Sequence, residues 1–319
     1  MLFVQASSSF LRWEVKYEYK SPDCFKKLVI TINGGTPGPK ILAQQGDTIV
    51  VELKNSLLTE NVAIHWHGIR QIGTPWSDGT EGVTQCPILP GDTFIYKFVV
   101  DRAGSYLYHA HYGIQREAGL YGSITVSVPN GESEPFAYDY DIGIILNDWF
   151  HKSTYEQAAG LSSIPFVWVG EPQSLLINGR GRFNCSLLAT PSLEAGGHNM
   201  TVVEVDGHYV EPFETKNLYI YSGETYSVLV KASQDPSRNY WVTTNVVSRK
   251  PTTPTGLAIL NYYPKYFKKS PPTLPTAGPL WNDTAPRLTQ SLAVKAHKSF
   301  IHSPPLTSDK VIVLLNTQN

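Results

Sequence analysis

The sequence contains no apolar run as long as a membrane span, which argues against a membrane-crossing helix. It also lacks a basic stripe: 26 Lys and Arg stand against 27 Asp and Glu, so nucleic acid is not an expected partner. Charged residues make up 17% of the chain, and helical periodicity is scarce outside a short stretch at residues 155–160. Aromatic residues, Gly and Pro are abundant instead, which is typical of a β-rich globular protein with many turns.

Cysteine is also scarce, and its count is odd. With only Cys24, Cys86 and Cys185, at least one thiol has no partner within the chain. Residues 1–9 are compatible with the end of an incomplete secretory signal. Together with three Asn-x-Ser/Thr acceptor sites, this predicts a secreted glycoprotein. The acceptor asparagines are Asn184, Asn199 and Asn282.

Two identical His-x-His motifs contain four of the nine histidines. His65 and His67 form the first motif, and His109 and His111 form the second. On a β-strand, residues i and i+2 point to the same face, so each motif directs two imidazoles one way. Imidazole is the commonest metal-ligating side chain and suits copper, zinc, iron and nickel. The spacing predicts a metal site between two adjacent strands, against the alternative of ordinary core or surface histidines.

A short pattern occurs three times: a glycine, an acid, a threonine and then an alternating apolar strand. Its glycines are Gly46, Gly91 and Gly223. The strand after the second copy carries the second His-x-His motif, whereas the matching positions after the third copy are Thr243 and Asn245. We infer two sandwich domains of common ancestry, with the metal site kept in the first only.

This repeat places one domain at residues 12–128 and another at residues 136–265, joined by a linker at residues 129–135. Residues 266–319 are rich in proline, which disfavours a regular sheet and predicts an extended connector. The apolar run at residues 311–316 has the pattern of a strand, and we expect it to open a further domain. The predicted fold class is therefore all-β, with tandem sandwiches and a C-terminal connector.

Longer motifs surround the histidines and continue through the second half of the chain. They cover residues 65–68, 73–79, 84–88, 108–111, 118–122, 161–163, 170–173, 176–181 and 314–319. With these motifs the chain resembles the blue multicopper oxidases, and more closely the plant L-ascorbate oxidases among them. The resemblance implies cupredoxin-like Greek-key β-sandwiches and a four-copper enzyme that oxidises ascorbate and reduces dioxygen to water. It also implies an extracellular or cell-wall location and a possible homodimer of the intact enzyme.

The resemblance assigns roles to six residues. His65 would bind the type 2 copper, whereas His67 and the second motif (His109 and His111) would bind the type 3 pair. Asp78 matches a carboxylate that orients water and helps proton delivery; the alternative is an ordinary turn residue of an Asp-Gly pair. Trp168 matches a residue of the ascorbate pocket; the alternative is simple core packing.

The sequence departs from the family in two ways. The type 1 copper ligands and the other half of the cluster ligands belong to a third domain, and no cysteine here adjoins a histidine. Between Cys185 and Tyr209 the family carries a longer stretch, so we expect an incomplete second domain. The family partners of Cys24 and Cys185 lie in that stretch, and Cys86 pairs into the third domain. All three thiols are therefore expected to be unpaired in a truncated chain, from a splice form or an incomplete gene model.

Three other functions compete with an ascorbate oxidase-type chain, which alone is expected to have negligible activity. A laccase-type phenol oxidase is disfavoured by the motif at residues 171–173. A non-catalytic copper-binding fragment would need only the four imidazoles. A structural cell-wall relative that has lost its ligands is disfavoured because the four histidines are retained.

Overall fold

The structure is a computed structural model. It describes residues 8–183, 185, 198–250, 253–262, 271–273, 275, 278–301, 303, 305–313 and 315. Most regular structure in these ranges is β-strand, as the composition predicts, and neither α-helix among them is long and apolar enough to cross a membrane. Residues 1–7 of the predicted signal remnant (1–9), the acceptor site at Asn184 and residues 191–197 of the shortened stretch lie outside the described residues, whereas residues 8 and 9 belong to the first strand.

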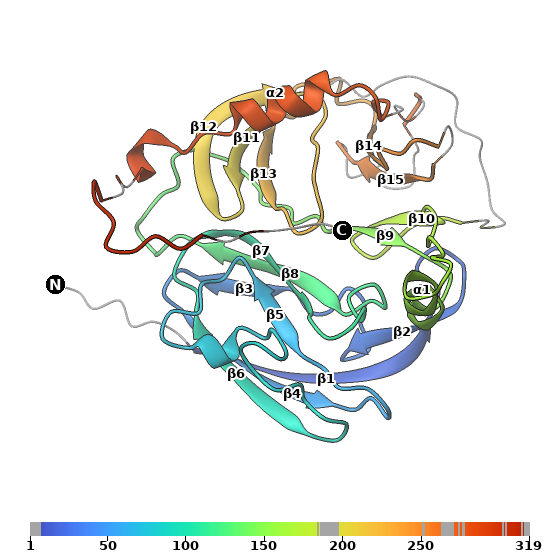
Figure 1. Cartoon of the computed structure of the whole chain (residues 1–319). Helices are drawn as coiled ribbons and strands as arrows, with labels where there is room; N and C mark the ends of the chain where they lie inside the picture. The colour runs from blue at the N-terminus through green and yellow to red at the C-terminus, as the bar shows by residue number, and fades with distance from the viewer. Residues whose placement is uncertain are drawn as a thin grey trace.

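The first half of the chain forms a β-sandwich of two four-stranded sheets (Figure 1). The strand orders are β2-β1-β4-β6 in one sheet and β3-β8-β7-β5 in the other. The strands are β1 (Ser8–Lys20), β2 (Lys27–Ile32), β3 (Ile41–Gln44), β4 (Thr48–Asn55), β5 (Ile64–His67), β6 (Thr93–Val99), β7 (Gly104–Ala110) and β8 (Tyr121–Ser127). A short 3-10 helix, η1 (Pro75–Ser77), lies between β5 and β6.

One continuous core fills the space between these two sheets. In β4, Ile49, Val51 and Leu53 alternate inward and are fully buried, as period-two patterning requires. The facing sheet contributes Trp66 from β5 and Tyr108 from β7 to the same cluster. At about 25 cal/mol per Å² of apolar surface, such aliphatic and aromatic burial is the main force that holds the sandwich together.

The Gly-acid-Thr pattern has the same conformation in all three copies. In each, the amide of the acidic residue donates to a carbonyl three residues earlier: Asp47 to Gln44, Asp92 to Leu89 and Glu224 to Tyr221. The glycine before the acid has a positive φ of 94°, 86° or 92°, which glycine adopts without steric cost. β4, β6 and β13 follow these turns, so the predicted repeat is confirmed in structure.

The second half of the chain has smaller sheets, with orders β10-β9, β12-β11-β13 and β14-β15 among the described residues. Helix α1 (Thr154–Leu161) confirms the short helix predicted near residues 155–160, and Ser153 caps it with Glu156 in a capping box. The strands are β9 (Leu146–Trp149), β10 (Ser174–Ile177), β11 (Met200–Val205), β12 (His208–Thr215), β13 (Tyr226–Val230), β14 (Tyr240–Asn245) and β15 (Thr255–Leu260).

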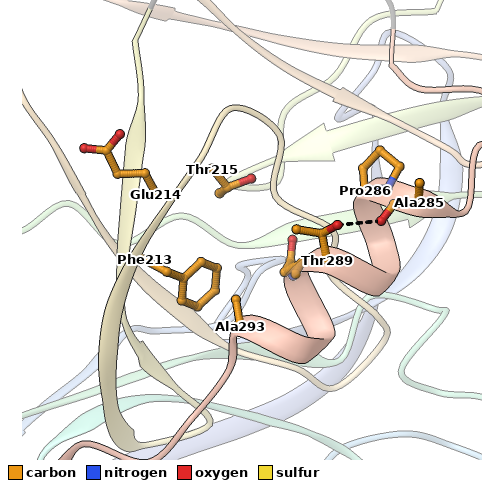
Figure 2. A pocket seen from close by; sticks show the side chains of 8 residues that line it. Phe213, Glu214, Thr215, Ala285, Pro286, Thr289 and Ala293 are labelled. Carbon is orange, nitrogen blue, oxygen red and sulfur yellow. Dashed lines mark hydrogen bonds between the residues drawn. The ribbon is translucent and has the colours of Figure 1, made fainter.

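The predicted extended connector contains a helix, and this corrects the sequence prediction. Helix α2 (Ala285–Ala293) begins with Pro286 in its first turn, where the missing amide would have had no partner within the helix. The helix lies beside β12, and Phe213 and Ala293 line a hollow between them (Figures 1 and 2). The chain then passes through the 3-10 helix η3 (Lys298–Phe300). Residues 311–313 are exposed and lie outside any strand.

Gln290 fastens α2 to the second half. Its buried side-chain amide accepts from the Tyr219 amide at 2.9 Å and donates to the Tyr219 carbonyl at 2.7 Å. After the helix, the chain runs along β12, where Glu211 donates to the Lys295 carbonyl and His297 donates to the Tyr209 carbonyl. This part of the connector is therefore packed against the second half.

A disulfide joins Cys24 to Cys185, which corrects the expectation that both thiols are unpaired. The amide of Gly181 donates to the Pro22 carbonyl, and the amide of Phe183 donates to the Asp23 carbonyl, so the two segments run together. The resemblance implied that each cysteine has its partner in the missing stretch. Instead, backbone hydrogen bonds between residues 22–23 and 181–183 bring Cys24 and Cys185 side by side. Cys86 is free, as predicted, and it is exposed.

A buried carboxylate, Asp23, lies next to the disulfide and forms further contacts between the two halves. The side chain of Asp23 is fully buried and accepts a hydrogen bond from the Ser174 hydroxyl at 2.6 Å. It also lies 2.7 Å from Nε2 of His151, whose ring stacks on Phe25. The β1–β2 connection of the first half is thus tied to the second half by a covalent bond and a buried polar group.

Candidate metal centre

The two His-x-His motifs lie on paired strands, which confirms the predicted arrangement. β5 and β7 are antiparallel neighbours, and their register places His65 directly opposite His109. The ladder continues beyond β7, where the amide of His111 donates to the Ala63 carbonyl at 2.8 Å. Alternation turns Trp66 into the core, so His65 and His67 face the other side of the sheet.

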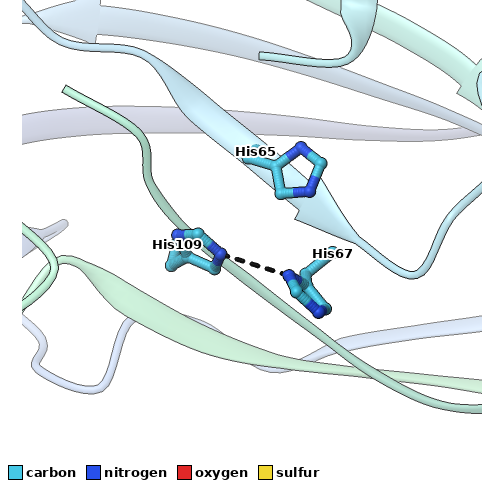
Figure 3. A group of neighbouring side chains, drawn as sticks. All are labelled: His65, His67 and His109. Carbon is cyan, nitrogen blue, oxygen red and sulfur yellow. Dashed lines mark hydrogen bonds between the residues drawn. The ribbon is translucent and has the colours of Figure 1, made fainter. Parts of the chain in front are cut away.

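The four imidazole rings form one cluster. The ring centre of His65 lies 5.5 Å from those of His67 and His109 and 5.6 Å from that of His111. Donor nitrogens of three of these residues, His65, His67 and His109, lie within 4.8 Å of one another (Figure 3). His111 adjoins this group, with its ring centre 6.0 Å from that of His109. These spacings suit metal ions bound by rings from both strands.

Backbone carbonyls orient two of the rings. Nδ1 of His65 lies 2.8 Å from the Asp78 carbonyl, and Nδ1 of His109 lies 2.9 Å from the Ala110 carbonyl. A carbonyl only accepts, so each Nδ1 carries the proton and each Nε2 keeps its lone pair. Such a hydrogen bond on the second ring nitrogen is the usual way in which a metal-ligating histidine is held. The donor set therefore fits a metal such as copper or zinc.

His67 presents the opposite edge of its ring. Its Nδ1 lies 3.4 Å from Nε2 of His109, as Figure 3 shows. The His109 nitrogen is the one left with a lone pair, so it accepts a hydrogen bond from Nδ1–H of His67 in the metal-free chain. If the His67 proton moves to Nε2, the other neutral tautomer, both facing nitrogens offer a lone pair to the space between the rings. A cation placed there would be attracted to both nitrogens.

Burial keeps these imidazoles in the neutral form that binds metals. It lowers the pKa of His109 to about 4, and the charge of His65 lowers it further. Burial also lowers the pKa of His67 below its usual value. Both rings are therefore uncharged at neutral pH in the metal-free chain, and a metal ion need not compete with the second proton of an imidazolium.

Asp78 lies beside His65 through both backbone and side chain. In addition to the carbonyl contact, its Oδ1 lies 3.5 Å from Nδ1 of His65. Its Oδ2 accepts a hydrogen bond from the Thr80 hydroxyl at 2.8 Å. The carboxylate is partly exposed and stands at the edge of the histidine cluster. The turn residue expected from the Asp-Gly pair therefore also contacts a candidate ligand.

Gly79 brings the Asp78 loop close to β5, which the sequence did not predict. Its φ is +86°, and a Cβ atom there would lie 1.7 Å from the Ile64 carbonyl oxygen. Only glycine lets the loop come this close to β5, and that approach brings Asp78 to His65. The only signal in the sequence was the Asp-Gly dipeptide, because a contact between the loop and the backbone of β5 leaves no other sequence pattern.

Trp168 lies elsewhere, in a hollow of ≈ 380 Å³ between the two halves. Its side chain is 65% exposed, so the alternative of core packing is wrong. Ile114, three residues after His111, lines the hollow, but the four histidines do not. Charged groups on its wall include Arg116 and Glu117, whereas Phe150 and Leu161 provide apolar surface.

Comparisons with known proteins agree with this geometry. A family model described as multicopper oxidase matches residues 14–131, and a second of the same description matches residues 141–196 and 191–265. The two segments of the second match meet where the sequence predicts missing strands.

Curated relatives include L-ascorbate oxidases of plants. The protein from Nicotiana tabacum is 47% identical over 356 residues, covering 98% of this chain and 61% of that protein. The protein from Cucumis sativus is 45% identical, covering 97% of this chain and 59% of that protein. The chain thus spans about three fifths of the length of these relatives.

Solved structures with the same fold include a laccase from Botrytis aclada, with a TM-score of 0.72 and 30% identity. Fet3p, a multicopper oxidase that functions in iron import, has a TM-score of 0.71 and 28% identity. Each alignment covers 86% of this chain and 56% of the other. The predicted cupredoxin-like β-sandwich fold is thereby confirmed.

Proposed function

The chain belongs to the multicopper oxidase family, and on that basis we propose that it is an L-ascorbate oxidase-type chain whose four histidines bind copper. The observation that carries the proposal is the register of β5 against β7, which places His65 opposite His109 and gathers the four rings. Copper bound there would supply the one-electron redox chemistry by which ascorbate is oxidised and dioxygen reduced. Reduction of dioxygen to two waters takes up four electrons and four protons.

The protein groups around this centre have separable tasks in the proposed reaction. His65 would bind the type 2 copper, and His67, His109 and His111 would bind the type 3 pair. The Asp78 carbonyl fixes which nitrogen of His65 is free, because it accepts the Nδ1 proton. The carboxylate of Asp78, partly exposed beside His65, would orient water and hold a proton for transfer.

Trp168 is the proposed contact for the donor substrate. Its exposed ring lies in a hollow of ≈ 380 Å³, whose wall also carries Arg116, Glu117 and Asp148. Nε of Arg116 lies 3.3 Å from Oε1 of Glu117. Ascorbate is a small planar molecule, so the aromatic face suits it. The higher identity to ascorbate oxidases also favours ascorbate over a phenol donor.

We further propose a secreted protein. Disulfides such as Cys24–Cys185 form and persist in oxidising compartments. Two of the predicted glycosylation acceptors, Asn199 and Asn282, are exposed and therefore accessible. The homodimer implied by the family resemblance stays a prediction.

Copper binding and turnover are separate properties of the isolated 319-residue chain. The sequence places no cysteine next to a histidine, and a thiolate ligand is what a blue copper centre requires. We therefore expect the isolated chain to bind copper, yet to oxidise ascorbate no faster than the same amount of free copper.

Copper titration of the metal-free chain against a competing chelator tests the site. We expect His109→Ala and His67→Ala to lower copper affinity by at least 10-fold, which is the range of losses even for outer-shell partners. His208→Ala is the matched control, because His208 is an exposed histidine outside the cluster. Unchanged affinity in both ligand variants would remove the proposed centre. Oxygen uptake with ascorbate, well above that of free copper, would contradict the expected inactivity.

A further inference from the structure

A turn from the second half of the chain forms a wall behind His67. A Cβ atom built on Gly223 would lie 3.2 Å from both Cε1 and Nε2 of His67. Gly223 itself has a φ of +92°, in the region that side-chain-bearing residues rarely adopt. Glycine thus allows the backbone of this turn to approach the imidazole edge directly.

The Gly223 turn is hydrogen-bonded to β7, the strand that carries His109. The Thr225 hydroxyl donates to the Ser105 carbonyl at 2.7 Å, and Ser105 lies on β7, four residues before His109. Thr225 and Asp206 also exchange two hydrogen bonds, of 2.9 Å and 2.8 Å, which tie the Gly223 turn to the turn after β11. These bonds fix the position of Gly223 relative to His109.

Tyr106 holds the two halves at this distance. A Cβ atom on Gly68, next to His67, would lie 2.8 Å from the Tyr106 ring, and one on Gly207 would lie 2.4 Å from it. The buried ring is therefore packed between a glycine of each half. The contact between His67 and Gly223 consequently has little freedom to open or close.

The ring of His67 is confined on two sides. Its Cε1–Nε2 edge meets Gly223, and its Nδ1 faces Nε2 of His109. We propose that Gly223 is a positioning residue, which holds His67 with Nδ1 directed into the metal space that it shares with His109. This inference rests on the proposed function, in which that space takes copper. It gives the second half a direct part in the centre, although all four ligands come from the first half.

The repeated turns provide matched controls. Gly46 and Gly91 occupy the same position of the same turn, with φ of +94° and +86°, but nothing lies within 4 Å of a Cβ atom built on either. Alanine at any of the three positions imposes a similar backbone strain. Only at Gly223 does the added methyl group also press on His67.

The experiment compares Gly223→Ala with Gly46→Ala and Gly91→Ala in the full chain, with copper(II) alone as the probe. Competition with a chelator gives the affinity, and electron paramagnetic resonance reports the nitrogen ligands. We expect Gly223→Ala to bind copper about 10-fold more weakly and to change the resonance spectrum. Both controls should match the wild type in affinity while losing a similar amount of stability.

Gly223→Asn separates contact from strain. Asn tolerates a positive φ better than Ala, but it still carries a Cβ atom next to His67. We expect its copper affinity to be lowered as in Gly223→Ala. Wild-type affinity in Gly223→Ala, recovery in Gly223→Asn, or an equal loss in all three alanine variants would each overturn the positioning role.

A measurement on the metal-free chain keeps this test distinct from that of the proposed function. The ¹⁵N chemical shifts of the His67 ring should change in Gly223→Ala and stay at their wild-type values in the two controls. If the wild type binds no copper, the proposed function fails, and the ring shifts still decide the contact. Unchanged shifts in Gly223→Ala would overturn the positioning role on their own.

Discussion

β4 in the first half and β13 in the second half begin with the same turn but lie in different surroundings. Position for position, Val51 follows Gly46 as Val228 follows Gly223. Val51 is fully buried between two sheets, whereas each residue of β13 retains some exposure to solvent. The turn chemistry thus determines where a strand starts, and the surrounding strands determine whether it becomes core.

The second half obtains its burial partly from the first. Glu204 on β11 is only 2% exposed, and it accepts hydrogen bonds from the Gly207 amide at 2.7 Å and the Ser105 amide at 3.4 Å. Ser105 belongs to β7 of the first sandwich. Because the second half buries Glu204 against the first, we expect it to be stable mainly while the two halves remain in contact.

The largest effect is expected from cutting the Cys24–Cys185 disulfide, which joins the two halves at a separate contact. The Cys24→Ser/Cys185→Ser double variant opens a disulfide with a sequence separation of 161, which we expect to cost up to about 5 kcal/mol. The second half should then unfold at a lower urea concentration than the first, giving two transitions in place of one. Cys86→Ser is the control and should leave the curve unchanged. A single transition at the wild-type midpoint would show that the contact between the two halves does not depend on the disulfide.

A smaller effect sharpens the comparison at the matched valines. Val51→Ala removes fully buried methyl groups and should cost about 2 kcal/mol, from lost burial plus the cavity left behind. Val228→Ala, at a partly exposed position, should cost less than about 1 kcal/mol. Urea midpoints of the two variants measure the difference. Equal losses would mean that β13 is packed as tightly as β4.

The smallest effect concerns Glu204, the buried carboxylate that contacts Ser105 of the first half. Burial raises the pKa of Glu204 above its usual value of 4.5, although hydrogen bonds from Ser227 and two amides oppose this shift. Because the raised pKa belongs to the folded state, ionisation of Glu204 costs stability as the pH rises through that pKa. Glu204→Gln keeps the shape and should therefore stabilise the chain at pH 7, by about 1 kcal/mol or less.

The stabilisation by Glu204→Gln should fade as the pH falls towards 4.5, where the wild-type group is protonated in the folded state too. Urea unfolding at several pH values gives the difference between the two proteins. Ser233→Ala, at an exposed position away from Glu204, serves as a control with no expected pH-dependent difference. A gain that is constant with pH would assign the effect to something other than the charge.

The sequence was sufficient for those features that depend on local periodicity. Alternation on strands placed His65 and His67 on one face, and the repeated turn placed the starts of β4, β6 and β13. The pairing of β5 with β7 followed from two equal spacings and a single chemical requirement, a shared metal.

Features that depend on contacts between distant segments were not predictable in the same way. The Cys24–Cys185 bond results from backbone pairing between segments 161 residues apart. Helix α2 was missed because Pro286 counts against regular structure unless its place in the first turn is known. The approach of Gly223 to His67 requires both halves to be in position, and a lone glycine carries no sign of what it faces.

The disulfide also determines what a protease can separate. Residues 137–144, between β8 and β9, are exposed throughout and include Tyr138 and Tyr140, which suit cleavage by chymotrypsin. A cut there would leave the histidine-bearing piece and the Gly223-bearing piece attached through Cys24 and Cys185. The nicked protein would migrate as one band on a non-reducing gel and as two bands after reduction, and it would keep the contact that surrounds His67.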